Sequence, residues 1–333
     1  MISSISGLRA LVTGATGLIG SWLVPMLLRS GCRVSALIPD WDPQSELIRS
    51  GIVTECRVFT GRLETEMDVS RAVSECEQEL VFNLGAQPLV GVGVRNPVHT
   101  FRTNIQGTWN VLEATRLLPS IRAVVVASSD KAYGATITLP YTEHMPVRAG
   151  APYETSKACA DLLTAAYAQT YGLPTAITRC GNVFGGGDLN WTRIVPGTIR
   201  SIIMGVRPVI RSDGTQVRDY VYVEDIARAY VRTAEALVAS EIPSGQAFNF
   251  SNERPMSVME IFDSVCGAMD AQVVPSVLGE ARTEIDRQYL DSSKARSMLG
   301  WSPAFDLERA LRNTIEWYEG YFSSEDRDPA RYP

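Results

Sequence analysis

The chain has 333 residues, of which 45% are hydrophobic and 20% are charged. This length and composition are those of a globular protein with about two domains, and they exclude disordered and fibrous architectures. Lys and Arg number 31 against 37 Asp and Glu, and the resulting net charge of −6 argues against a nucleic acid or an anionic membrane surface as partner.

We expect no membrane span, because no apolar run is long enough, and residues 1–7 lack the pattern of a signal peptide. The six cysteines show no CxxC spacing, and the only histidines are His99 and His144. No metal site is therefore expected. Scattered thiols in a chain without an export signal predict a cytoplasmic protein.

Residues 1–180 alternate short apolar segments with helical ones, a pattern typical of an α/β fold with a Rossmann-type doubly wound parallel sheet. Strands are expected at 8–13, 33–38, 56–60, 80–84, 121–127 and 174–180. Helices are expected after Gly17 and over 97–117, 154–171 and 194–204, and a strand and a helix at 218–239 would return to the sheet. We predict a Rossmann domain over 1–180, rejoined by 218–250, and a smaller mixed α/β substrate domain made of 181–217 and 251–333.

The first predicted strand runs directly into a GxxGxxG loop that opens a helix, Thr13-Gly14-Ala15-Thr16-Gly17-Leu18-Ile19-Gly20. Glycines permit a tight turn and a close approach of the backbone, while the helix N-terminus faces a pyrophosphate. The pattern predicts a dinucleotide site formed by Gly14, Thr16, Gly17, Leu18, Ile19 and Gly20.

Asp40 ends the second predicted strand, where a carboxylate can accept hydrogen bonds from the adenosine ribose and repel a 2′-phosphate. This position favours NAD over NADP, unless Asp40 is only a solvated turn residue. Small residues follow the fourth predicted strand, in the segment Leu84, Gly85, Ala86 and Gln87. They either let the backbone approach the inner ribose and the nicotinamide or serve the packing of helix on sheet.

Tyr153 and Lys157 form a YxxxK pair on a predicted helix, and their i, i+4 spacing puts both side chains on one face. The lysine charge is expected to lower the pKa of the phenol from ~10 toward neutral, which makes Tyr153 a usable base. Alone, such a pair is usually a surface pair, but behind a glycine-loop Rossmann half it indicates catalysis.

The fifth predicted strand ends in Ser129-Asp130-Lys131. Because the carboxyl end of a strand in an open α/β sheet faces the ligand crevice, a hydroxyl, a carboxyl and an amine are presented together to a substrate. The alternative is that Asp130 caps a turn and Lys131 points to water.

Together with three later motifs, the glycine loop, the Ser129-Asp130-Lys131 segment and the YxxxK pair make this sequence similar to members of the extended short-chain dehydrogenase/reductase superfamily that act on nucleotide sugars. The later motifs are Arg179-Cys180-Gly181-Asn182-Val183-Phe184-Gly185, Arg218-Asp219-Tyr220-Val221-Tyr222-Val223-Glu224-Asp225 and Leu299-Gly300-Trp301-Ser302-Pro303. Within the superfamily the chain is most similar to CDP-glucose 4,6-dehydratases, on segments that include Ala86-Gln87-Pro88-Leu89-Val90, Thr103-Asn104 and 181–188. The resemblance implies NAD as cofactor, with Asn104 beside it.

The resemblance also implies the dehydration of CDP-glucose or a related nucleotide hexose. Ser129 would hydrogen-bond the sugar 4-hydroxyl, Tyr153 would remove its proton while hydride passes to NAD, and Lys157 would hold the ribose. Asp130 would protonate the leaving 6-hydroxyl, and Lys131 stands where dTDP-glucose enzymes carry a glutamate base. Which of Asp130 and Lys131 acts at C5 stays open, because a coupled pair can share protons.

Two segments depart from the dehydratase pattern. Residues 217–222 read as in nucleotide-sugar epimerases, so a 4-epimerase that uses Tyr153 and Lys157 but needs neither Asp130 nor Lys131 is the alternative. Arg62 stands where the family usually has an aspartate for adenine. A non-enzymatic NAD-binding module is a third hypothesis.

The diphosphate of the substrate is expected to contact the amide of Asn182 and a bidentate guanidinium of Arg218. Further candidates for substrate contacts are Gln87, Ser129, Arg193, Arg211 and Tyr289. Trp191 and Tyr289 either stack on the nucleotide base or pack within the protein.

The predicted helices 97–117 and 154–171 carry apolar residues on more than one side. These residues are Phe101, Ile105, Trp109, Val111 and Leu112 on the first helix and Leu162, Leu163, Ala166 and Tyr167 on the second. One stripe must cover the sheet, and a second predicts a four-helix homodimer interface, unless both stripes are buried within the monomer. The resemblance also implies this dimer.

Overall fold

The computed structural model describes residues 3–148, 150–280 and 285–323. Residues 281–284 and 324–333 of the predicted substrate domain lie outside the described residues. Within them the strands are β1 (Arg9–Thr13), β2 (Arg33–Ile38), β3 (Arg57–Thr60), β4 (Leu80–Asn83), β5 (Ala123–Ala127), β6 (Thr175–Cys180), β7 (Asn182–Phe184), β8 (Val209–Ile210), β9 (Val217–Tyr222), β10 (Gln246–Phe250), β11 (Pro255–Ser257) and β12 (Ser276–Val277).

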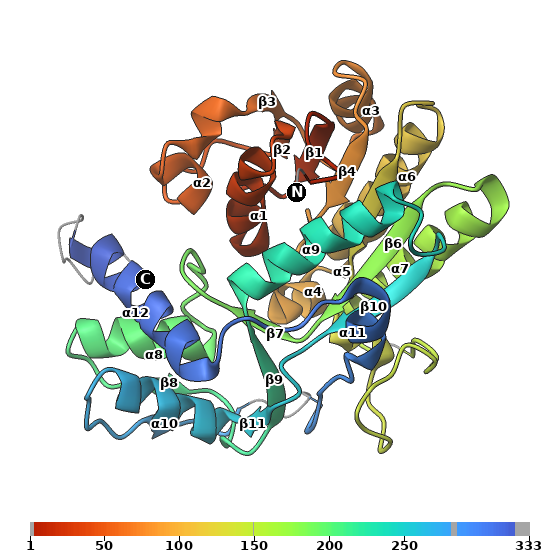
Figure 1. Cartoon of the computed structure of the whole chain (residues 1–333). Coiled ribbons are helices and arrows are strands. Elements are labelled where there is room, and N and C mark those ends of the chain that lie inside the picture. Colours follow the sequence, from red (N-terminus) through yellow and green to blue (C-terminus); the bar gives the residue numbers. More distant parts are fainter. Residues whose placement is uncertain (1–2, 149, 281–284, 324–333) are drawn as a thin grey trace.

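The helices alternate with these strands (Figure 1). The α-helices are α1 (Leu18–Arg29), α2 (Glu46–Arg49), α3 (Glu66–Ser74), α4 (Val90–Arg95), α5 (Pro97–Phe101), α6 (Gly107–Arg116), α7 (Pro152–Tyr171), α8 (Ile194–Ile203), α9 (Val223–Val238), α10 (Val258–Ala268), α11 (Ser293–Leu299) and α12 (Leu307–Ser323). Short 3₁₀ segments are η1 (Ile52–Glu55) and η3 (Asp130–Tyr133), and η2 (Arg102–Gln106) is a π-helical turn. Among the described helices, none combines the length and the apolar character needed to cross a bilayer.

The main sheet is parallel, with the strand order β10-β6-β5-β4-β1-β2-β3. Its central strands are largely buried; all five residues of the apolar run β5, for example, are buried. Such runs fit a sheet that is covered on both faces, because alternating polar residues would be buried without partners. The order reverses between β1 and β4, where Thr13 lies opposite Asn83. The predicted doubly wound Rossmann-type sheet is confirmed.

Helices cover both faces of this sheet (Figure 1). On one face α1 and α9 pack through Leu23, Leu27 and Tyr230 against the strands. On the other face α3 and α6 contribute Val69 and Leu112 to a second apolar cluster. The sheet is therefore the middle of three layers, and its strand ends are free to carry a site.

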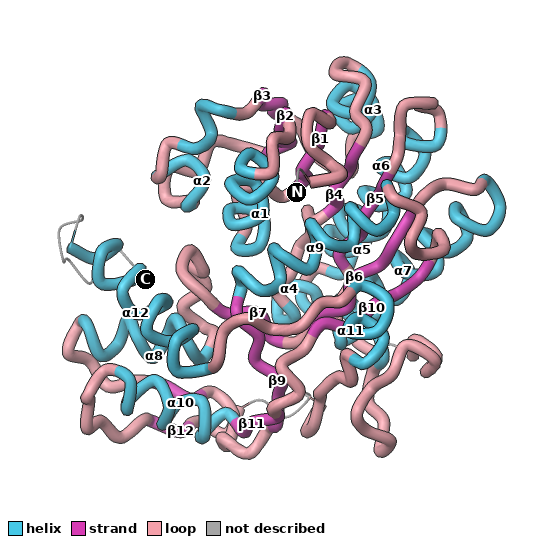
Figure 2. The backbone as a smooth tube through the Cα atoms, in the orientation of Figure 1, coloured by secondary structure: helices cyan, strands magenta, loops and turns pink. Residues whose placement is uncertain are grey.

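A smaller unit is built from the later part of the chain (Figure 2). It contains the sheets β11-β9-β7 and β12-β8, with α8, α10 and α12 around an apolar cluster that includes Ile199, Ile261 and Tyr318. The strand predicted near 218 was expected in the main sheet, and this is wrong: β9 pairs with β7 and β11. The return to the main sheet is made by α9 and β10, because the apolar face of α9 packs on β5 and β6.

The predicted helix over 97–117 is interrupted. The π-helical turn η2 separates α5 from α6. At this turn, Thr108 Oγ1 donates a hydrogen bond to the Asn104 carbonyl at 2.7 Å. A π-turn widens the helix by one residue and is common at functional sites. The periodicity of apolar residues does not reveal it, because both flanking segments are helical.

Candidate active site

The loop between β1 and α1 lies against neighbouring backbone. A Cβ on Gly14 would lie 2.7 Å from the Cα of Gly85, and a Cβ on Gly20 would overlap the carbonyl oxygen of Gly14. Gly14 has a φ of +66°, a conformation that favours glycine. After Gly17, α1 begins with neither a side-chain cap nor an acidic residue in its first turn. Its N–H groups can therefore receive an anion, and the predicted residues 14–20 fit a pyrophosphate.

A side chain that the sequence analysis passed over joins the ends of β1 and β4. Thr13 Oγ1 donates to Asn83 Oδ1 at 2.8 Å and accepts the N–H of Gly85 at 3.1 Å. These strands flank the point where the strand order reverses, which is where open α/β sheets bind ligands. The segment Leu84, Gly85 and Ala86 is partly exposed there. The available signal was a threonine at the end of an apolar strand.

Gln87 and Asn104, predicted at the cofactor or the substrate, are buried and hydrogen-bonded within the protein. The Gln87 amide donates to Thr100 Oγ1 at 2.9 Å and to the Leu89 carbonyl at 3.2 Å. Asn104 accepts the Gln87 N–H at 2.7 Å and donates to Ser156 Oγ at 2.9 Å. Both side chains therefore fasten the loop after β4 to the helix layer, and their predicted ligand contacts stay predictions.

Asp40 is exposed two residues beyond β2. β3 lies next to it, since Ile38 pairs with Thr60. Arg62 follows β3 and is also exposed, with its guanidinium 3.6 Å from the carboxylate of Glu64. Asp40 and Arg62 thus flank the same edge of the sheet.

Ser129, Asp130 and Lys131 lie together where β5 ends and η3 begins. Ser129 Oγ donates to Asp130 Oδ1 at 2.9 Å and accepts the Lys131 N–H at 3.2 Å. Asp130 is 2% exposed. Burial raises the pKa of this carboxyl, and the charge of Lys131 and the bond from Ser129 only partly oppose the effect. A buried carboxyl with a raised pKa is suited to act as a general acid.

Tyr153 and Lys157 lie in the first two turns of α7. The helix begins with Pro152 at its first position, and the Glu154 carboxylate accepts the N–H of Ala151 at 3.1 Å, which satisfies a free backbone donor. Lys157 is buried, and its Nζ donates to the Ala127 carbonyl at the end of β5 at 2.8 Å. The helix start therefore places both side chains beside Ser129 and its neighbours.

The expected effect of Lys157 on Tyr153 is wrong in this structure. Burial raises the pKa of Tyr153 to about 12, and the opposing effects come from the charge of Arg193 and a hydrogen bond with Ser129. Burial also lowers the pKa of Lys157 to about 8. Because the Lys157 ammonium is directed at a strand carbonyl, its charge does not offset the desolvation of the phenol.

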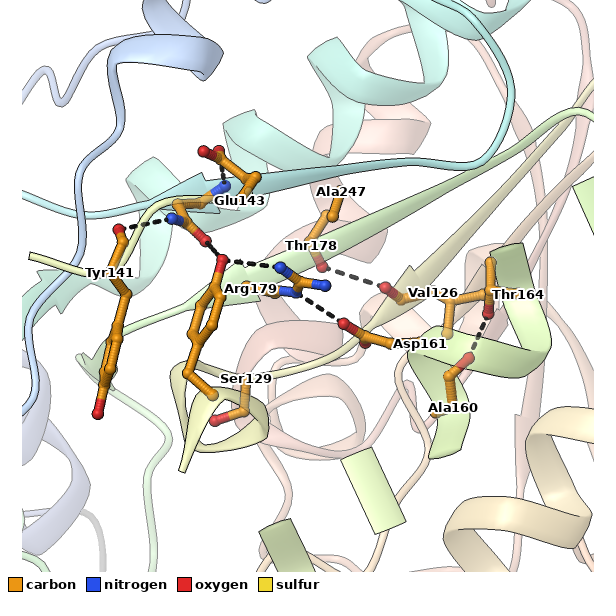
Figure 3. Close-up of polar contacts among 12 residues, drawn as sticks. Val126, Ser129, Tyr141, Glu143, Ala160, Asp161, Thr164, Thr178, Arg179 and Ala247 are labelled. Atoms are coloured by element: carbon orange, nitrogen blue, oxygen red, sulfur yellow. Dashed lines mark hydrogen bonds and ion pairs between the residues drawn. The ribbon is translucent and has the colours of Figure 1, made fainter. Parts of the chain in front are cut away.

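Figure 3 shows a buried ion pair between Arg179 and Asp161, which lies on the same helix as Lys157. Arg179 Nε donates to Asp161 Oδ2 at 2.6 Å, and Arg179 also donates to the Tyr133 hydroxyl at 2.7 Å. That hydroxyl donates to Asn249 Oδ1 at 2.7 Å. Asp161 lies one turn after Lys157, and its charge raises the pKa of Lys157 against the effect of burial. The network thus supports the lysine from within the core.

Two of the three predicted arginines, Arg193 and Arg218, lie close enough to the candidate catalytic residues for their charges to act on them. Arg218 is 3% exposed and donates to the carbonyls of Val217 at 2.9 Å and Asp286 at 3.2 Å. Its charge acts on Asp130, as that of Arg193 acts on Tyr153. Arg193 is also paired with the carboxylate of Asp188 at 2.9 Å. Both cations therefore stand beside the predicted reaction centre.

The other predicted substrate residues are less closely connected. Asn182 on β7 and Tyr289 are partly exposed. Arg211 is exposed after β8, and in the described part of the chain no hydrogen bond or ion pair links its side chain to the catalytic residues. Trp191 packs against Tyr318 and Phe322 of α12, with ring centroids 5.9 and 5.7 Å apart. Packing is thus the role of Trp191 in this structure.

Comparisons with known proteins place the chain among nucleotide-sugar enzymes. The model of the NAD dependent epimerase/dehydratase family matches residues 10–250. The CDP-glucose 4,6-dehydratase of Salmonella typhimurium is 30% identical over 336 residues, which cover 96% of this chain and 93% of that protein. The UDP-glucose 4-epimerase of Mycolicibacterium smegmatis is 29% identical, over 93% of this chain and 98% of that protein.

A solved structure extends the likeness to three dimensions. The UDP-glucose 4-epimerase of Thermotoga maritima, crystallised with UDP-glucose, has a TM-score of 0.86 at 28% identity and covers 95% of this chain and 100% of its own. Proteins named as dehydratases and as epimerases are thus both similar to this chain along nearly its whole length.

Proposed function

Because this chain belongs to the NAD dependent epimerase/dehydratase family, we propose that it is a nucleotide-sugar 4,6-dehydratase, a lyase that removes water from a nucleotide hexose. The similarity to the CDP-glucose 4,6-dehydratase of Salmonella typhimurium supports CDP-glucose or a related nucleotide hexose as the substrate. The observation that carries the proposal is the Asp130–Lys131 pair beside Ser129 and Tyr153, because a 4-epimerase needs no acid and base at C5 and C6.

The glycine loop and the first turn of α1 hold the pyrophosphate of NAD, and Asp40 accepts from the adenosine ribose. NAD bound there would supply a hydride acceptor for C4 and the hydride returned to C6, and its positively charged ring would favour an ionised phenol nearby. Ser129 hydrogen-bonds the 4-hydroxyl, and Tyr153 takes its proton. Lys157 donates to the inner ribose. Tyr153 has a pKa of about 12 in the protein alone, so its phenol is neutral there. The positive charge of the bound nicotinamide ring would make the phenol a stronger acid and so a usable base.

The C4 ketone acidifies the proton on C5, and elimination follows. Asp130 protonates the departing 6-hydroxyl, a role supported by the raised pKa of its buried carboxyl. Lys131 is the neighbouring amine that can remove the C5 proton. The diphosphate lies with Arg218, Arg193 and Asn182.

The assembly we propose is a homodimer through a four-helix bundle of α5–α6 and α7 from two copies. Trp109, Leu162 and Val98 are 53%, 61% and 57% exposed on these helices, and a partner copy would cover such apolar side chains. All six cysteines are free thiols, which fits the reducing cytoplasm.

An NAD-dependent 4-epimerase is the second candidate. It is favoured by the similarity to the UDP-glucose 4-epimerases of Mycolicibacterium smegmatis and Thermotoga maritima. Tyr153 and Lys157 would serve it equally, with hydride returning to the opposite face of C4.

The products of a panel of CDP-, dTDP-, GDP- and UDP-hexoses, analysed by mass spectrometry, test the proposal. Loss of one water from one member is expected and identifies both reaction and nucleotide. An unchanged mass with a new stereoisomer on chromatography would select the epimerase instead.

The double variant Asp130→Asn with Lys131→Ala tests the assignment of the pair. Dehydration should be abolished, while reduced nicotinamide still appears transiently, because Tyr153 and Lys157 remain. Unaltered turnover in this variant would contradict a dehydratase.

A further inference from the structure

Lys131 has a buried partner from a distant part of the sequence. Its Nζ donates to Oε1 of Gln288 at 3.1 Å, across 157 positions of the chain. Gln288 is fully buried. The contact is made to the amine that stands beside Asp130, so it determines where that amine can reach.

The backbone around Gln288 is held on two sides. Its N–H donates to the Val217 carbonyl at 3.0 Å, and the Val217 N–H donates to the Asp286 carbonyl at 2.8 Å. The Tyr141 N–H donates to the Tyr289 carbonyl at 2.9 Å. The backbone of Gln288 therefore has little freedom to move, and its side-chain Oε1 offers Lys131 an acceptor that is carried by a fixed segment.

The same segment also supports Arg218. The carbonyls of Val217 and Asp286 that accept from the Arg218 guanidinium belong to the bonds that fix Gln288. A residue proposed to hold the diphosphate and a residue proposed to act on the hexose thus share one support. The spacing between these two ends of the substrate site follows from this segment.

We propose that Gln288 is a positioning residue that holds the amine of Lys131 at C5 of the substrate, an inference that rests on the proposed dehydratase function. In the step concerned, the lone pair of Nζ takes the C5 proton, and the electrons of the C5–H bond form the C5=C6 double bond. The C6–O bond breaks, and the hydroxyl takes the proton of Asp130 and leaves as water. A neutral amide suits this step, because it accepts from the lysine without adding a negative charge that would hold the ammonium form.

The variant Gln288→Met removes the acceptor and keeps a side chain of similar length. A misplaced catalytic group costs about 10²-fold in rate, so kcat for dehydration should fall about 10²-fold with little change in KM. Reduced nicotinamide should accumulate in a single turnover, because oxidation at C4 no longer flows into elimination. Exchange of the C5 proton with solvent deuterium should slow to the same extent.

The chain offers a matched control in Gln246, whose Oε1 accepts from Lys294 Nζ at 2.7 Å, between β10 and α11. Gln246→Met removes the same kind of bond away from the reaction centre and should leave all three measurements unchanged. Equal slowing of C4 oxidation and C5 exchange in Gln288→Met would overturn the proposal, as would wild-type behaviour.

Gln288→Glu covers the case in which the methionine variant fails to fold. It keeps an acceptor for Lys131 but adds a charge, so C4 oxidation should persist while C5 exchange stays slow; exchange at the wild-type rate would contradict the proposal. A wild-type enzyme that dehydrates none of the nucleotide hexoses would instead refute the proposed function itself.

Discussion

Tyr153 and Lys157 are one helical turn apart on α7, yet burial raises the pKa of Tyr153 to about 12 and lowers that of Lys157 to about 8. Specific neighbours oppose these shifts in part. Arg193 and Ser129 act on the tyrosine, and Asp161 acts on the lysine. Proton affinities at this site are thus decided by residues outside the YxxxK motif.

Asp161→Asn should shift the pH dependence of C4 oxidation. Protonated Lys157 is the active form, so the rate falls as pH rises through its pKa of about 8. Asp161 raises that pKa, and its neutralisation lowers it, so the alkaline limb should move to lower pH. The measurement is the pH profile of reduced-nicotinamide formation in single turnovers.

Loss of a partner from the buried Arg179 pair should also cost about 3–5 kcal/mol of unfolding free energy. Asp225→Asn is the control for this loss of stability. Asp225 lies on α9, is as buried as Asp161, and accepts the N–H of Ala304 at 2.8 Å. It should reduce stability and leave the alkaline limb in place. A limb that moves equally in both variants, or in neither, would contradict the role of Asp161.

At the scale of elements, the loop between β1 and α1 forms the proposed dinucleotide site because its backbone packs closely against α1 and against the end of β4. The first turn of α1 rests on the carbonyl of Gly14, and the loop rests on Gly85 after β4. The GxxGxxG spacing predicts this arrangement, because only glycine leaves room for backbone on backbone.

Gly20→Ala should weaken NAD binding at least tenfold and lower Tm, because the added methyl meets the Gly14 carbonyl and the backbone of Ala15. Calorimetric titration of nucleotide-free protein with NAD measures the binding directly. Gly320→Ala on α12 is the control, since a Cβ there meets nothing within 4 Å and should be neutral or stabilising by about 0.5–1 kcal/mol. Equal losses in both variants would remove the special role of Gly20.

For the whole molecule, the apolar residues of the two predicted helices divide between a core and a surface. Val111 and Leu112 are fully buried against the sheet, and Leu163 and Tyr167 pack partly on the same cluster. Trp109 and Leu162 stay exposed on the outer side. The second stripe therefore exists but is narrower than its sequence suggests.

Leu162→Glu should convert the proposed dimer into a monomer, because a carboxylate in an apolar contact loses its hydration without a partner. Light scattering after size-exclusion chromatography measures the mass. Met67→Glu is the control, since Met67 is 80% exposed on α3, a helix that is not part of the proposed bundle. A monomeric wild type, or a Leu162→Glu variant that stays dimeric, would contradict the interface.

The sequence by itself determined the parallel sheet, the glycine loop and the two catalytic motifs, because periodicity and residue spacing act within a few positions of the chain. It located Tyr153, Lys157 and Asp130 at the site, but it could not determine their protonation, which depends on burial. It also missed the interruption at 102–106 and placed β9 in the wrong sheet. The tertiary structure decided these points and the contact of Lys131 with Gln288, because each depends on contacts between residues far apart in the sequence, which no local pattern encodes.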